Sequence, residues 1–396
     1  MKKHHHVQKN GYRRATLLGL LLGLLCGAQS ARVMAESPGS RSFVRPGIFL
    51  NQEDLAFIAT YKPGDIRHPL HEGFEVLRNS PLASLDYAPE PEEVVITYSG
   101  RETTPLKEAG ETAYAHALLW IVTGDDRHRD HAIAVLNSWS STLKELRSAP
   151  GGPPEQNSLE ISWHAPTFVA AAEILRHYPG GAEAWPAHEV ERFDDMIRMF
   201  LETLRSASFW GRRNLPNQPM SEAIALMAVG IYLDDREVYE AGLRQYKHVL
   251  PFMIVPSGEI REIRRTRPRP DWPHARFGLE AAMQGAELAY IQGDNAFEMK
   301  LEDDERPRLL LGMEWIAGGM MTGQLHSEGL GRTVEFNHRL ITQRIKGYDM
   351  VFRRYRELGW ADQMPYTVRA LREKLPPSGN QGKHHPWGSA THRRAD

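Results

Sequence analysis

The apolar positions of the chain recur with a helical period through most of its length. Ala113, Ala117, Trp120 and Ile121 share one helical face, and Gly124 is a typical helix end. The residues around Ala132, Leu136 and Trp139 continue the pattern in a second helix. The same spacing predicts further helices over residues 52–61, 162–178, 190–207, 220–233, 237–250, 274–292, 307–318, 339–358 and 367–374.

Strand-like alternation is scarce in this sequence, and residues 94–98 are a short β candidate. Helices of similar length joined by short turns of Gly, Pro and Asp predict antiparallel helix pairs. We therefore expect an all-α chain of antiparallel helix pairs, and such pairs can curl into an α/α toroid around a central cleft. Two loops, at 150–154 and 264–273, interrupt the array, and such loops on a rigid scaffold commonly carry function.

The first 35 residues have the pattern of a secretory signal peptide. Lysines and arginines precede an apolar run at residues 17–25, which is too short to span a bilayer, and Val33-Met34-Ala35 offers a cleavage site. We expect residues 1–35 to be removed and residues 36–396 to form one periplasmic or secreted domain. No later apolar run is long enough for membrane insertion.

Charge and cysteine content narrow the classes of partner. The chain has 48 basic and 50 acidic residues. Six of the basic residues and none of the acidic ones lie in the signal segment, so residues 36–396 have a net charge of about −8. A nucleic-acid partner is therefore not expected. The single cysteine, Cys26, lies in the signal segment, so no disulfide and no cysteine-based zinc site is expected. The sequence has no H-E-x-x-H motif, and we expect no metal and no cofactor.

Several ordered segments resemble the alginate lyase superfamily, including its glucuronan-cleaving branch. They extend over nearly the whole chain after the signal and comprise Arg45-Pro-Gly-Ile-Phe-Leu-Asn-Gln-Glu-Asp-Leu55, residues 113–125, 162–175 and 217–235, His274 with Gly278-Leu279, residues 363–367 and His385-Pro-Trp-Gly388. The resemblance implies an α/α toroid that cleaves a uronic-acid polysaccharide, alginate or glucuronan, by β-elimination. It implies an anionic polysaccharide as partner and leaves the oligomeric state open.

Elimination from a uronate needs a group that neutralises the C6 carboxylate, a base for the C5 proton and an acid for the departing O4. By resemblance, Asn217 matches the asparagine that binds the carboxylate, although an N-cap is an equally good use of Asn at a helix start. The alginate-cleaving relatives often follow this asparagine with histidine. Here the next residue is Gln218, which we expect to contact substrate.

The arginine-rich loop before residue 274 is the second candidate region. His274 opens a helix, where the positive helix end favours a neutral imidazole able to accept a proton, and the resemblance also points to it as catalytic. Arg265 is our choice for the catalytic carboxylate-neutralising arginine, with Arg267 and Arg269 as substrate contacts. Solvated surface charge is the alternative for this loop.

Tyr348 and Tyr355 lie seven residues apart and so share a helix face. Relatives carry a tyrosine and a histidine between them, which are replaced here by Phe352 and Arg354. If the first tyrosine of this block is the catalytic one in the relatives, the resemblance makes Tyr348 the acid/base and Tyr355 a substrate contact. If the middle tyrosine is the catalytic one, its replacement by Phe352 implies an altered or inactive protein. Core packing is the alternative for both tyrosines.

Trp163, His164 and Trp387 complete the expected substrate-binding residues. Trp163 could stack on a sugar and His164 could contact a carboxylate, although core packing suits both equally well. Trp387 could fold back over the cleft.

Two other functions remain open at this level. A glycoside hydrolase would need two opposed carboxylates, for which Glu222 and Glu262 are available, although neither sits in a hydrolase motif. A non-catalytic uronan-binding protein would explain the departures at Gln218 and Phe352.

Overall fold

The computed structural model describes residues 42–98, 103–210, 215–265, 269–380, 383–384 and 386–394. The predicted signal peptide, residues 1–35, lies outside the described residues. Ser42–Asp396 form one compact unit. None of the described helices is long and apolar enough to cross a bilayer.

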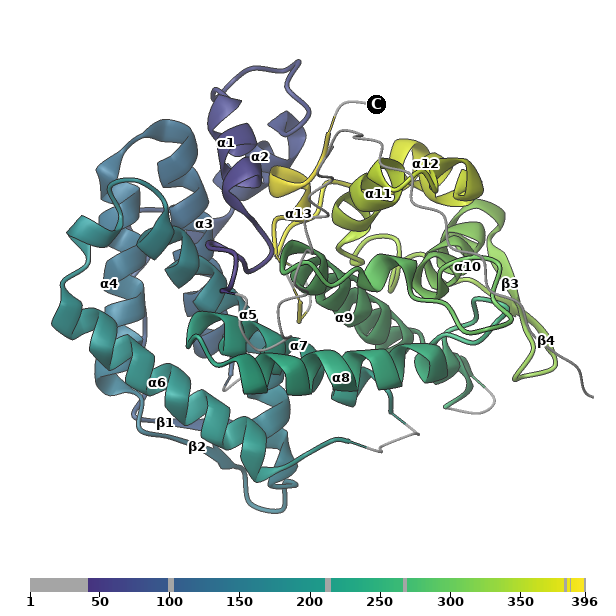
Figure 1. Ribbon diagram of the computed structural model, residues 1–396, viewed down its shortest axis with the longest axis horizontal. Coiled ribbons are helices and arrows are strands. Elements are labelled where there is room, and N and C mark those ends of the chain that lie inside the picture. The colour runs from purple at the N-terminus through teal and green to yellow at the C-terminus, as the bar shows by residue number, and fades with distance from the viewer. Residues whose placement is uncertain are drawn as a thin grey trace, which may run out of the picture. The chain divides into compact units, whose positions relative to one another are not determined.

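Helices in two layers build most of this unit (Figure 1). Neighbouring inner helices pack on one another in chain order, and the outer helices pack against them. The inner helices are α3 (Thr104–Thr123), α5 (Glu155–His177), α7 (Asn217–Tyr232) and α9 (Trp272–Ile291), and the outer ones are α4 (Asp126–Thr142), α6 (Ala187–Ser206) and α8 (Arg236–Met253). The all-α toroid predicted from the sequence is confirmed.

Composition separates the two layers. The inner helices are buried around most of their circumference, whereas α6 and α8 each bury one apolar stripe and expose charged residues. Close contact between α7 and α8 needs glycine. A Cβ at Gly230 would lie 2.4 Å from the backbone nitrogen of Tyr239, and one at Gly242 would lie 2.6 Å from the carbonyl oxygen of Ala223.

The remaining helices extend the array at both ends of the chain. Helix α11 packs on α9, α12 packs on α10, and α13 packs on α2. Their bounds are α1 (Gln52–Thr60), α2 (His71–Arg78), α10 (Arg308–Thr322), α11 (Tyr348–Glu357), α12 (Pro365–Glu373) and α13 (Gly388–Thr391).

Two small two-stranded sheets accompany the helices. Strand β1 (Val94–Thr97) pairs in parallel with β2 (Glu145–Ser148), and β3 (Gln324–Ser327) pairs antiparallel with β4 (Arg332–Glu335). The strand expected at 94–98 is confirmed. The other three escaped prediction because each has a single apolar residue, whereas β1 has three β-branched apolar residues in a row.

Some helix boundaries differ from the prediction. The helix expected over 339–358 begins only at Tyr348, because Gly347 takes a left-handed conformation with φ of 91° and the preceding residues form turns. Helix α5 begins at Glu155, seven residues earlier than expected, since its first two turns are largely polar. Asn217 is the first residue of α7 and not its N-cap, so the capping interpretation is wrong.

The segment Val44–Gly47 is anchored between two inner helices. Glu173 of α5 accepts hydrogen bonds from Arg45 and from the backbone nitrogen of Gly47, at 2.5 and 3.1 Å. Gln292, just after α9, accepts from the backbone nitrogen of Val44 at 3.0 Å and donates to the carbonyl of Gly47 at 3.2 Å. These bonds hold the start of the domain across the ends of α5 and α9.

A buried ionic cluster joins elements from both ends of the domain. Asp54 of α1 is fully buried, pairs with Arg353 and Arg354 of α11, and accepts a hydrogen bond from Arg394 at 3.1 Å. Arg354 also bonds Glu287 of α9, with its closest approach at 2.6 Å. The cluster therefore ties α1, α9, α11 and the C-terminal segment together.

Asp54→Ala should destabilise the fold by about 3–5 kcal/mol, because it leaves buried arginines without their counter-charge. Denaturant unfolding followed by circular dichroism measures the loss. Asp195→Ala is the control, since Asp195 is 69% exposed on α6 and forms only a surface pair with Arg198, so its effect should stay within about 0.5 kcal/mol. Equal effects of the two substitutions would refute a special role for Asp54.

Candidate active site

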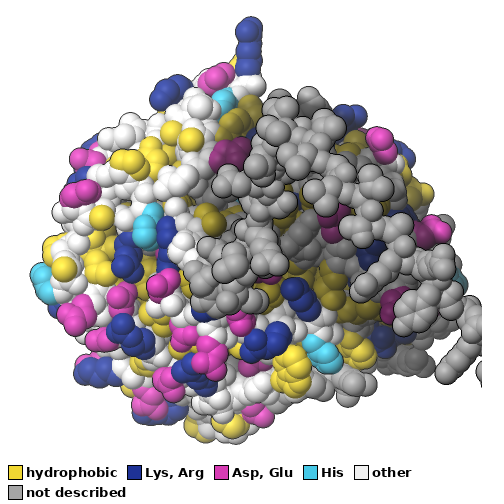
Figure 2. Space-filling model, viewed as in Figure 1, with side chains coloured by type: hydrophobic (Ala, Val, Ile, Leu, Met, Phe, Trp, Pro, Cys, Tyr) yellow, Lys and Arg dark blue, Asp and Glu magenta, His cyan; other side chains and the backbone are white. Residues whose placement is uncertain are grey.

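The candidate site lies where the N-terminal ends of inner helices meet. Asn217 begins α7, His274 lies in the first turn of α9, and both contact the loop that ends at Asp271. Helix N-termini carry partial positive charge and favour anions. Over the coloured part of the face in Figure 2, basic and acidic side chains are interspersed, so attraction of a polyanion depends on local groups such as these.

Asn217 is held by a buried carboxyl group. Its side-chain nitrogen donates to Oε1 of Glu262 at 2.8 Å, and its backbone nitrogen donates to the same oxygen. The side-chain amide has a second hydrogen besides the one donated to Glu262. Asn217 is itself buried, with 1% of its surface exposed. Burial raises the pKa of Glu262 to about 8, although the hydrogen bonds from Asn217 oppose the shift.

Space for the Glu262 carboxyl depends on a glycine of α9. A Cβ at Gly278 would lie 3.0 Å from Oε2 of Glu262 and 2.8 Å from the sulfur of Met253. The Asn217–Glu262 pair therefore fits only because α9 presents no side chain here.

His274 forms a dyad with Asp271. Its Nδ1 lies 2.8 Å from Oδ1 of Asp271, which also caps α9 by accepting from the backbone nitrogen of His274. A carboxylate partner requires hydrogen on Nδ1, so Nε2 of the neutral ring is the basic nitrogen. The imidazole is 35% exposed, which leaves it open to a ligand.

Arg265 lies against this dyad. Its Nη1 is 2.8 Å from Oδ2 of Asp271 and 2.9 and 3.2 Å from the two ring nitrogens of His274. Its side chain is 36% exposed, so its charge faces both the dyad and solvent. The structure thus brings Arg265 and His274 together, as the sequence analysis expected.

The other arginines of this loop differ in placement. Arg264 makes a two-pronged ion pair with Glu259 at 3.0 and 2.9 Å and is structural. Arg269 is exposed, and Arg267 lies outside the described residues. Gln218 is half-buried beside Asn217.

A buried lysine near α9 was not predicted. Lys346 donates from Nζ to the carbonyl of His384 at 2.7 Å and from its backbone nitrogen to Glu280 at 3.1 Å. Burial lowers the pKa of Lys346 to about 8 against the attraction of Glu111 and Glu280. Burial likewise raises the pKa of Glu280 to about 7, although Arg276 opposes the shift. Lys346, Glu280 and Glu111 were not predicted as a group because they come from separate segments of the chain. Glu280, an acidic residue within the apolar sequence of α9, was the one feature of the sequence that could have indicated a buried charge here.

An aromatic row links this lysine region to the dyad. The ring of Phe277, half-buried on α9, lies 6.0 Å from that of His274 and 6.4 Å from that of His384. His384 is buried, and burial together with the charge of Lys346 lowers its pKa to about 3. The imidazole of His384 is therefore uncharged at neutral pH and packs beside Phe277 at the edge of the site.

Trp163 and His164 lie together on α5. His164 is buried and lies 3.2 Å from Oε2 of Glu160. Burial tends to raise the pKa of Glu160, but His164 and Lys383 hold it at about 2. Trp163 is half-buried, with Nζ of Lys383 4.3 Å from its ring centroid. Trp163 keeps an accessible edge, whereas His164 serves the Glu160 pair.

Three expected site residues lie in the core. Tyr348 donates to the carbonyl of Met313 at 3.0 Å, Tyr355 donates to that of Phe297 at 3.0 Å, and Trp387 is 1% exposed. Burial raises the pKa of both tyrosines well above the ordinary range. These placements do not fit the expected acid/base role of Tyr348 or substrate contacts by Tyr355 and Trp387, so we assign all three side chains to packing.

The described residues contain no group of three or more His, Cys, Asp or Glu side chains arranged to hold a metal ion.

The family comparison identifies this α/α toroid as a polysaccharide lyase. The alginate lyase family model matches residues 87–321, and the chain belongs to this family. No curated protein matches the sequence.

Solved alginate lyases share the fold. Alginate lyase A1-III from Sphingomonas species A1 superposes with a TM-score of 0.66 at 13% identity, covering 90% of this chain and 99% of that one. A histidine-to-alanine variant of A1-III complexed with a tetrasaccharide gives 0.67 at 11% identity, covering 91% and 99%. An alginate lyase from Bacteroides ovatus gives 0.63 at 12% identity, covering 88% and 98%.

Replacing Glu262 by Gln should make the stability of the protein less dependent on pH. The pKa of Glu262, about 8 in the folded protein against an ordinary 4.5, means that folding retains a proton that the unfolded chain releases. This stabilisation is complete below the ordinary pKa and is lost as pH rises through the folded value. From pH 5 to 8, the unfolding free energy of the wild type should fall relative to that of Glu262→Gln by on the order of a few kcal/mol.

Denaturant titrations at several pH values measure this difference. Glu202→Gln is the matched control, because Glu202 is 71% exposed on α6. If the unfolding free energies of wild type and Glu262→Gln changed with pH in parallel, the folded protein would not be keeping a proton on Glu262.

Proposed function

We propose that this enzyme cleaves alginate by β-elimination, with His274 as the proton-transfer residue. The observation that carries the proposal is the oriented His274–Asp271 dyad beside Arg265, with Asn217 fixed by Glu262 nearby. We also propose that residues 1–35 direct export, which the N-terminal residue of the mature protein would test.

In this proposal, Asn217 and Arg265 neutralise the C6 carboxylate of the substrate. Arg265 supplies a permanent positive charge, and Asn217 supplies an amide hydrogen whose direction is set by Glu262. Donors fixed before the reaction stabilise the developing enolate without having to reorient. The N-termini of α7 and α9 add partial positive charge at the same place.

Proton transfer then runs through Nε2 of His274. This nitrogen removes the C5 proton, the C4–O4 bond breaks, and a C4=C5 double bond forms. The imidazolium, stabilised by Asp271, returns the proton to O4, which leaves as a hydroxyl group. One residue can do both steps only when the C5 hydrogen and O4 lie on the same face of the sugar ring. Mannuronate and glucuronate have that arrangement, and guluronate does not.

Two further observations disfavour hydrolysis. Glu222 accepts from the backbone nitrogen of Phe209 at 3.1 Å and from Gln245 at 2.6 Å, and it is buried. Glu262 is buried against Asn217. Neither carboxyl group faces a substrate as a glycosidase acid or nucleophile must.

Substitution of His274 tests the mechanism. His274→Ala should lower kcat by about 10²–10⁴-fold, because it removes the proton carrier. Asn217→Ala should lower kcat/KM by about 10²–10³-fold, because it removes a donor to the developing charge. The measurement is the ultraviolet absorbance of the conjugated double bond in the product.

The controls separate chemistry from folding. His188→Ala changes an exposed histidine of α6 and should leave the rate unchanged. Asp271→Asn keeps a good N-cap residue but loses the charge that orients the imidazole, so it should lower kcat without unfolding the protein. Full activity in His274→Ala would overturn the assignment.

Substrate preference gives an independent check. Wild-type enzyme should release unsaturated product from polymannuronate and little from polyguluronate, because His274 acts from one face. Glucuronan belongs in the same panel, since its C4–C5 geometry also permits the reaction. Preferential cleavage of polyguluronate would show that acid and base are different residues on opposite faces. Saturated products would show hydrolysis instead.

A further inference from the structure

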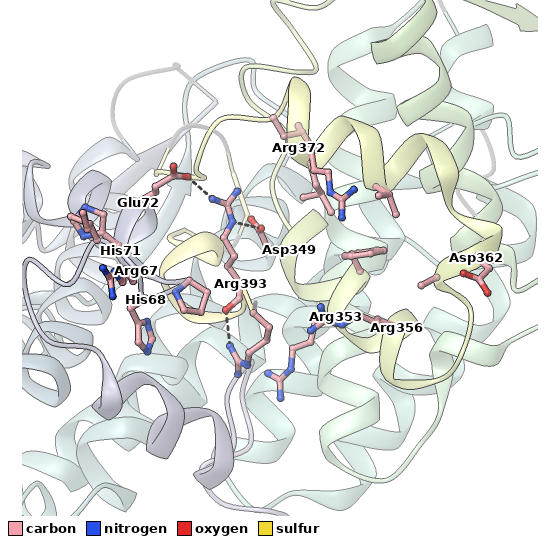
Figure 3. Close-up of a pocket in the computed structure, with 18 residues that line it drawn as sticks. Arg67, His68, His71, Glu72, Asp349, Arg353, Arg356, Asp362, Arg372 and Arg393 are labelled. Atoms are coloured by element: carbon pink, nitrogen blue, oxygen red, sulfur yellow. Dashed lines mark hydrogen bonds and ion pairs between the residues drawn. The ribbon is translucent and has the colours of Figure 1, made fainter. Parts of the chain in front are cut away.

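A cavity whose lining does not include the His274 dyad lies between residues 66–72, α11, α12 and the C-terminal segment (Figure 3). It has a volume of about 670 Å³ and is formed by residues 66–72, by α11, α12 and the turn between them, and by Arg393 and Arg394. This volume falls within the range of small-ligand sites. Six arginines line it: Arg67, Arg353, Arg356, Arg372, Arg393 and Arg394.

The cavity and the core use different faces of α11. Asp349, Phe352 and Arg356 line the cavity, at spacings of three, four and seven residues that define one helix face. Tyr348 and Tyr355 are buried in the core. The cavity is therefore separate from the packing around α9 that supports the proposed catalytic residues.

The arginines of the cavity differ in how their charge is balanced. Arg353 and Arg394 pair with the buried Asp54, which does not line the cavity. Arg393 bridges Glu72 and Asp349 at 2.6 and 3.0 Å, across the middle of the view in Figure 3. Arg67 is exposed and forms no ion pair within the part of the chain that the structure describes.

The lining holds more than positive charge. Glu72, Asp349 and Asp362 place carboxylates beside the arginines, and Phe352 and Leu371 add apolar surface. Guanidinium groups bind carboxylates in a planar, two-pronged way, and protein carboxylates accept hydrogen bonds from hydroxyl groups. A simple phosphate would gain nothing from the carboxylates. A ligand with carboxylates, hydroxyl groups and a C–H face would use all three kinds of surface.

We propose that this cavity binds a short uronate oligosaccharide at a site distinct from the His274 dyad. The choice of uronate rests on the proposed function, because the enzyme would release such oligosaccharides. Arg67 and Arg372 bind the carboxylates, and Asp362 accepts from sugar hydroxyls.

Binding stoichiometry tests the proposal without relying on turnover. In a His274→Ala background, native mass spectrometry and calorimetry with mannuronate trisaccharide should reveal two binding sites. Adding Arg67→Gln and Arg372→Gln should weaken one of them by about tenfold or more, as expected for the loss of charged hydrogen bonds. Adding Asn217→Ala and Arg265→Ala instead should weaken the other.

The control is Arg198→Gln, since Arg198 is 57% exposed on α6, outside the cavity. It should leave both sites intact. In otherwise wild-type enzyme, Arg67→Gln with Arg372→Gln should leave the elimination rate on short substrates unchanged.

Other outcomes are equally decisive. A single site, abolished by the Asn217 and Arg265 substitutions alone, would overturn the proposal. Inorganic phosphate binding that needs Arg67 and Arg372, without saccharide binding there, would overturn it in favour of a phosphate site. Saccharide binding in the cavity of a protein that releases no unsaturated product would refute the proposed lyase activity while leaving this inference standing.

Discussion

The burial of Asp54 among arginines is the constraint on which the arrangement of the last helices depends. A buried carboxylate without a partner costs several kcal/mol, and so does a buried guanidinium. Asp54 and Arg354 meet this cost only when α1, α9 and α11 are in place together, because Arg354 also needs Glu287. The cluster therefore couples helices that lie far apart in the sequence. By fixing α11, it also fixes the start of that helix, where Lys346 enters the site region.

The same principle operates at the candidate active site on a smaller scale. Glu262 is buried with its pKa raised, and its oxygen is paired with Asn217. Asp271 caps α9, orients His274 and bonds Arg265. Each of these carboxyl groups thus holds a side chain with a proposed catalytic role in one orientation. Such fixed donors are effective in catalysis because they need no reorganisation when charge develops.

The departures of this chain from its relatives have physical explanations in the fold. The sequence resemblance leads us to expect a histidine at the position of Arg354 and a tyrosine at that of Phe352. Arg354 is a structural cation between Asp54 and Glu287. Phe352 lines the arginine-rich cavity. These differences do not disable the proposed chemistry, because its proton carrier lies on α9. The segment that the resemblance made catalytic thus supplies a structural cation and part of the cavity lining.

Helical periodicity by itself determined the class of fold, because an apolar stripe recurring every three to four residues can be buried only by helix packing. The ordered family motifs also pointed to Asn217, Arg265 and His274, which share one short loop and two helix starts. The roles of Tyr348 and Trp387 could not be settled in this way, since a buried and an exposed aromatic residue have the same local pattern. Glu262, Lys346 and the arginine-rich cavity were decided by tertiary structure alone. Their chemistry comes from burial and from partners on distant segments, and neither property is encoded in the spacing of neighbouring residues.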